Sequence, residues 1–79
     1  MNGQHRAIRA LLSTMAPRRA VEYIQSFQLR PEEEAALIEC DVRGLSHIQA
    51  ADKLHLSPEV IKRRRQRAYS KIADEINHR

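Results

Sequence analysis

Basic side chains crowd the stretch from residue 62 to residue 71, and this stretch offers the clearest chemistry in the chain. Ser57, Pro58 and Glu59 precede it and are typical of a helix start: a capping hydroxyl, a proline in the first turn and a carboxylate near the positive end of the helix dipole. With Ile61 taken as the buried residue, a rotation of about 100° per residue predicts a polar outer face on this helix. The members of that face are Glu59, Lys62, Arg63 and Gln66, with Arg67 further around the helix.

This face carries groups that recognise base edges in the major groove of duplex DNA. Arg can donate two hydrogen bonds to guanine, Gln can pair with adenine and Glu can accept from cytosine, and a good bidentate pair contributes about 1–3 kcal/mol of discrimination. Arg67 is expected to contact phosphate instead. Charge alone leaves a second interpretation open, in which the run from Lys62 to Arg65 is only a solvated helix face.

The residues before the basic helix favour the DNA-binding interpretation. Ser46 stands three residues before Gln49, the spacing of a capping box, and predicts a short helix from His47 to Leu54. After a turn of about three residues, the basic helix is expected to run from Pro58 to about Asn77. Its inward residues are predicted to be Ile61, Ala68, Ile72 and Ile76. A capped short helix, a tight turn and a longer basic helix form the layout of a helix-turn-helix, whose second helix enters the major groove.

Three further helices are predicted upstream. The first runs from Gln4 to Met15, the second starts at Pro17, and the third starts at Pro31 because a proline disfavours helix at the residue before it. The apolar stripes of these helices are Ile8, Leu11, Leu12 and Met15; Ala20, Val21, Ile24 and Phe27; and Ala36, Leu37 and Cys40. Arg43 is expected to close the third helix, with Gly44 as its left-handed cap.

Three consecutive carboxylates open the third helix, at Glu32, Glu33 and Glu34. We interpret this run as stabilisation of the helix end on a solvated face, in preference to a metal or partner site. The fold class predicted from all these elements is all-α, a small helical bundle of about five helices that contains a helix-turn-helix. Residues 1–28 are expected to form an N-terminal helical pair that packs on the core or extends it, and residues 29–79 the helix-turn-helix domain.

Composition excludes several other classes of function. With 79 residues the chain has room for one small core but hardly for a catalytic cleft, and no serine has the context of a nucleophile, so an enzyme is not expected. His5, His47, His55, His78 and Cys40 lack the paired spacing of a metal site, and no glycine-rich loop suggests a cofactor. The single cysteine and the lack of a long apolar run predict a cytoplasmic protein without a membrane segment.

Charge is distributed in three blocks. The first 30 residues carry five Arg against one Glu, residues 31–56 carry six acids against two bases, and residues 57–79 carry seven bases against three acids. The bases of the last block are dense enough to attract a polyanion.

Several short motifs along the chain align, without a gap, with one known sequence pattern. They are Leu29-Arg30-Pro31-Glu32, Gly44-Leu45-Ser46, Ala51, Leu54, Leu56 with Ser57, and Val60-Ile61-Lys62 followed by Arg67-Ala68 and Lys71-Ile72. On these residues the stretch from Leu29 to Ile76 resembles region 4 of bacterial sigma factors and, slightly less closely, the terminal domain of LuxR-type regulators.

The resemblance implies promoter-type recognition of double-stranded DNA. Base reading would fall to Glu59, Lys62 and Arg63, and contacts to phosphate to Ser46 and Arg67. The complete candidate DNA-binding set is Ser46, Ser57, Glu59, Lys62, Arg63, Gln66 and Arg67. The earlier sigma regions are not found in this sequence, so the expected role is that of a bacterial or phage transcription regulator or a sigma-like factor, and not of a complete sigma factor.

The chain departs from the family pattern at three positions. His55 replaces the usual turn glycine, Ala50 stands where the family prefers Ile, and Arg65 occupies a commonly apolar position near the inner edge of its helix, where its stem can lie against the core.

Other functions remain open at this point. The sigma-like half could instead dock on RNA polymerase or a partner factor with only nonspecific DNA affinity, or serve DNA packaging or recombination. The first two helices could also form a homodimer face.

Overall fold

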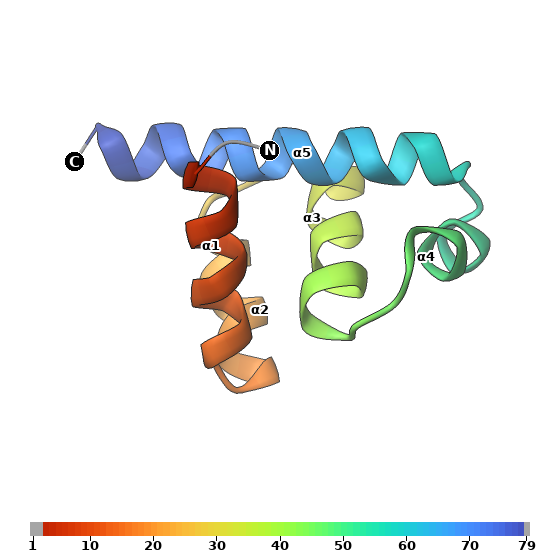
Figure 1. Ribbon diagram of the computed structural model, residues 1–79, viewed down its shortest axis with the longest axis horizontal. Helices are drawn as coiled ribbons and strands as arrows, with labels where there is room; N and C mark the ends of the chain where they lie inside the picture. The colour runs from red at the N-terminus through yellow and green to blue at the C-terminus, as the bar shows by residue number, and fades with distance from the viewer. Residues whose placement is uncertain (1–2, 79) are drawn as a thin grey trace.

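The computed structural model describes residues 3–78. Residues 1–2 of the predicted segment 1–28 and residue 79 of the predicted segment 29–79 lie outside the described residues. Within residues 3–78 the chain forms five α-helices and no strand, and the all-α prediction is confirmed (Figure 1). The elements in order are α1 (Gly3–Thr14), α2 (Pro17–Gln25), α3 (Pro31–Leu37), the π-helical turn η1 (Ile38–Val42), α4 (His47–Leu54) and α5 (Pro58–Asn77).

The longest helix, α5, forms one edge of the molecule, and the shorter helices lie along one side of it (Figure 1). Its inward residues join two apolar clusters. Ile61 packs in a cluster with residues of α3, η1 and α4, whereas Tyr69 and Ile72 pack in a larger cluster with residues of α1 and α2. A single helix therefore links both parts of the core and leaves its opposite face to solvent.

Local caps set the helix boundaries around the turn. Ser46 Oγ accepts from the Gln49 N–H at 3.1 Å, and Gln49 Oε1 accepts from the Ser46 N–H at 3.0 Å, so the predicted capping box is present. Ser57 Oγ accepts from the Val60 N–H at 3.3 Å at the start of α5. Gly44 has the left-handed φ of +74° expected of a helix cap.

His55 ends α4 in the left-handed conformation, with φ of 58° and ψ of 42°. The turn therefore keeps the backbone geometry that a glycine would supply, although a side chain is present there.

Two apolar residues that the sequence pattern places inward are exposed. Leu11 is 40% exposed because it lies on the flank of α1, about 100° around the helix from the buried Leu12. Ile76 is 41% exposed because the carboxyl-terminal end of α5 projects beyond the other helices (Figure 1).

The second and third helices also differ from their predicted form. The second ends at Gln25, before Phe27, which is only partly buried, and Val21 is half-buried. The third closes with the π-helical turn η1, which keeps Cys40 buried. Burial raises the pKa of the Cys40 thiol, consistent with a packing role. Among the described residues no helix is long and apolar enough to cross a membrane, and no group of three metal-ligating side chains is found.

Candidate nucleic-acid interface

Five polar residues of α5 point away from the core, and we call them the α5 outer face. They are Glu59, Lys62, Arg63, Gln66 and Arg67, and all five are exposed. Within residues 3–78 none of them forms a hydrogen bond or an ion pair with another side chain. The positive charges of Lys62, Arg63 and Arg67 are therefore not neutralised by an acid of the same molecule at contact distance.

The remaining bases of α5 are bound to acids of α3 and η1. Arg64 Nε lies 2.9 Å from Glu32 Oε1, and Lys71 Nζ lies 2.7 Å from Glu33 Oε1. Arg65, the third member, donates from Nε to Asp41 Oδ1 at 2.7 Å. The basic side chains of α5 therefore form two groups on different sides of the helix. One group is paired with acids of neighbouring elements and holds α5 on the core, and the other faces solvent.

The Arg65–Asp41 pair is the most buried of these ion pairs, with side chains 15% and 2% exposed. Asp41, the anchor of this pair, accepts hydrogen bonds from Arg65 and from the Tyr69 hydroxyl. The Arg65 guanidinium also lies over the Tyr69 ring, 5.5 Å from its centroid. Burial disfavours the charged form of Arg65, but the attraction of Asp41 outweighs it and raises the pKa of the guanidinium, so Arg65 stays charged. Burial and the Asp41 carboxylate raise the pKa of Tyr69, so its hydroxyl remains a donor.

Glu33 corrects the interpretation of the acidic run as a solvated face. It is 1% exposed, and its Oε1 accepts from Lys71 and, at 3.2 Å, from the Arg30 N–H. Burial raises the pKa of Glu33, but these hydrogen bonds and the charge of Lys71 outweigh burial and hold the pKa below its ordinary value. This carboxylate is therefore a structural anchor of α5.

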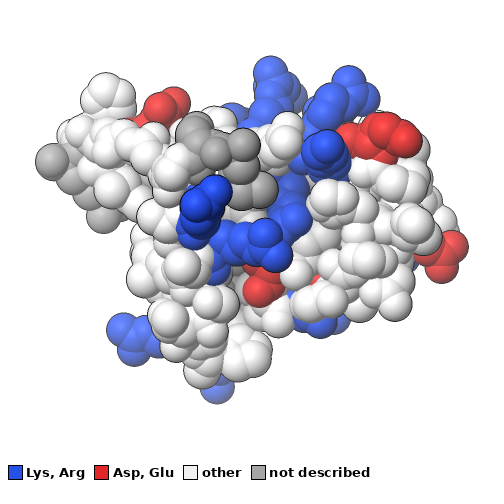
Figure 2. All heavy atoms as spheres, in the orientation of Figure 1, with Lys and Arg blue, Asp and Glu red and all other residues white. Residues whose placement is uncertain are grey.

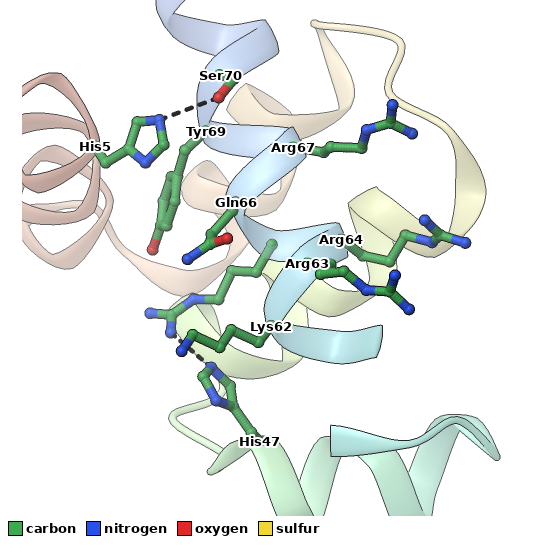
Figure 3. A pocket seen from close by; sticks show the side chains of 10 residues that line it. His5, His47, Lys62, Arg63, Arg64, Gln66, Arg67, Tyr69 and Ser70 are labelled. Atoms are coloured by element: carbon green, nitrogen blue, oxygen red, sulfur yellow. Dashed lines mark hydrogen bonds between the residues drawn. The ribbon is translucent and has the colours of Figure 1, made fainter. Parts of the chain in front are cut away.

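The α5 outer face borders a hollow of about 730 Å³ that is also lined from two other helices. Figure 3 shows His5 reaching it from α1 and His47 from α4. In the same view Lys62 and Gln66 point to the side of α5 where His5 lies, whereas Arg63 and Arg67 point to the other side. The exposed side chains therefore spread to both sides of the helix.

His47 is held next to the outer face by the Asp41 anchor. Arg65 donates to His47 Nε2 at 3.2 Å, and because Arg has no acceptor, that nitrogen carries the lone pair. Burial and the nearby charges of Arg65 and Lys62 lower the pKa of His47, so the ring is neutral near pH 7.

The two capping serines lie at the starts of α4 and α5, and both are exposed. Because Ser46 Oγ acts as acceptor in the cap, its O–H group is left to donate to a phosphate. The N–H groups at a helix start also favour an anion.

Sequence reasoning found the outer-face residues but not the residues that border them. His5 lies beside Ser70, 65 residues later in the chain, and no local signal links the two. His47 could have been recognised, since it is the first residue of a capped helix directly before the turn.

No family model, no curated protein and no solved structure matches this chain.

Proposed function

We propose that the chain binds double-stranded DNA with a sequence preference, using α4, the turn at His55 and α5 as a helix-turn-helix, and acts as a transcription regulator. The observation that carries the proposal is the division of charge on α5. Arg64, Arg65 and Lys71 are bound to acids, whereas the bases of the α5 outer face are exposed and unpaired. Basic side chains without an acidic partner attract a polyanion. The polar residues between them can form hydrogen bonds with the edges of DNA base pairs.

The dimensions support insertion of the first turns of α5 into a major groove. With its side chains an α-helix is about 10–12 Å across. A B-form major groove is about 12 Å wide and admits one helix. In this arrangement Arg63, Gln66 and Glu59 contact base edges.

Contacts to phosphate then come from the edges of the unit. Arg67 points to one side of α5 (Figure 3), and Ser46 opens α4. The Asp41 anchor supports both helices, because Arg65 contacts Asp41 of η1 and His47 of α4.

Selection from a pool of randomised duplexes, followed by affinity measurements at increasing salt, tests the proposal. Specific binding keeps its preference for the selected duplex over a scrambled one when salt weakens the phosphate contacts. If selection enriches no sequence and all affinity disappears at high salt, the DNA-reading function is wrong, and docking on RNA polymerase or another protein becomes the better explanation.

A further inference from the structure

The first helix begins beside the DNA-binding face proposed above. His5 Nε2 lies 3.2 Å from Ser70 Oγ on α5, and the His5 ring centroid lies 5.4 Å from that of Tyr69. His5 also lines the same hollow as Lys62 and Arg67 (Figure 3). The amino-terminal end of α1 therefore lies directly beside the α5 outer face.

This end of α1 is positively charged. Arg6 and Arg9 are exposed, and within residues 3–78 neither forms an ion pair or a side-chain hydrogen bond. α1 contains no Asp or Glu. Arg9 follows His5 by four residues and so lies on the same side of the helix. In Figure 2, Lys and Arg side chains gather over the upper part of α1 and along α5 on one face.

The start of α4 and the first turns of α1 lie beside α5 at different points along its axis. His47, at the start of α4, lies next to Lys62, whereas His5 lies next to Ser70. These two positions are eight residues apart on α5, or about 12 Å along the helix axis. Each strand of B-form DNA carries one phosphate per about 3.4 Å of its axis, so a duplex that holds α5 in its major groove presents backbone phosphates along this whole length.

We propose that the first turns of α1 are a second contact to the DNA backbone, in which Arg6 and Arg9 bind phosphates that flank the groove entered by α5. This inference rests on the proposed DNA-binding function. The arginines of α1 would add affinity without sequence preference, because phosphate contacts carry no base information.

The test compares two variants that lose the same charge. Arg6→Ser with Arg9→Ser removes the α1 bases; Arg18→Ser with Arg19→Ser removes two exposed bases of α2. The control pair is remote, because α2 starts at the end of α1 that lies farthest from α5 (Figure 1). Circular dichroism on both variants checks that each is folded.

Each phosphate contact changes the slope of log affinity against log salt by about 0.9, which corresponds to roughly eightfold in affinity at 0.1 M salt. The α1 variant should therefore bind the selected duplex with a slope shallower by about 1.8 and a markedly lower affinity, while its preference over a scrambled duplex stays unchanged. The α2 variant should keep the wild-type slope.

Three outcomes separate the inference from the proposed function. Equal slopes for the wild type and the α1 variant overturn the inference alone. Equal losses in the α1 and α2 variants also overturn it, because the effect is then one of net charge. A wild-type chain that prefers no duplex overturns the inference together with the proposed function.

Discussion

Arg65→Met should destabilise the fold strongly, although Arg65 lies in a run of four consecutive bases. The substitution keeps an apolar stem but leaves the Asp41 carboxylate, which is 2% exposed, without its positive partner. Removing one partner of a buried ion pair costs about 3–5 kcal/mol. We expect about 3 kcal/mol, near the lower end of that range, because the Tyr69 hydroxyl still donates to Asp41.

This loss is large for a chain of 79 residues. At about 0.05–0.15 kcal/mol per residue, the whole free energy of unfolding is about 4–12 kcal/mol. For a domain of this size each kcal/mol lowers Tm by about 4–8 °C, so a fall of roughly 12–24 °C is expected. Urea and thermal unfolding followed by circular dichroism measure both quantities.

Two further variants make this reasoning refutable. Arg63→Met removes the same charge from the α5 outer face and should change the free energy of unfolding by no more than about 0.5 kcal/mol. Adding Asp41→Asn to Arg65→Met should recover part of the loss, because the neutral amide no longer leaves a charge buried. Equal stability of the Arg63 and Arg65 variants, or no recovery in the double variant, would contradict the claim that Arg65 anchors α5 whereas Arg63 only faces solvent.

The other predictions concern base reading, the turn and acid stability. Arg63→Ala should relax base preference, whereas Arg67→Ala should weaken all duplexes similarly and flatten the salt slope by about 0.9; equal effects in a competition assay would contradict these roles. His55→Gly should raise the free energy of unfolding by about 0.5–1 kcal/mol, because a left-handed L-residue costs about 1–2 kcal/mol and the added freedom of glycine costs somewhat less; a loss in urea unfolding would contradict this. The pKa of Glu33 is lowered, so its pairing with Lys71 contributes fully above the ordinary pKa of 4.5 and is lost as pH falls through the lower folded value. Glu33→Gln should therefore flatten the acid limb of stability against pH, and an unchanged acid limb would show that Glu33 is not the group that titrates there.

Helix boundaries near the turn could be predicted because their signals are local. The Ser46 and Gln49 capping box, the Ser57 cap and the Gly44 turn each act within a few residues. The starts of α4 and α5 follow from these residues, and the phase of α5 follows from Ile61 as its buried residue. The outer-face residues could be found for the same reason.

Pairing between distant segments could not be predicted in this way. Glu33 and Lys71 are 38 residues apart, and Asp41 and Tyr69 are 28 apart, so no periodic pattern reveals that these groups meet. The acidic run therefore suggested a solvated face, although Glu33 is buried. Exposure of Ile76 depends on where the other helices end, which is also a property of the assembled fold.

The most direct test of the central claim is an NMR titration of the ¹⁵N-labelled chain with its selected duplex. The account predicts that the largest shifts lie in α5 from Glu59 to Arg67 and at the start of α4, with the amides around Arg19 on α2 unchanged. Shifts concentrated on α2, or a duplex that leaves the α5 outer face unperturbed, would contradict it.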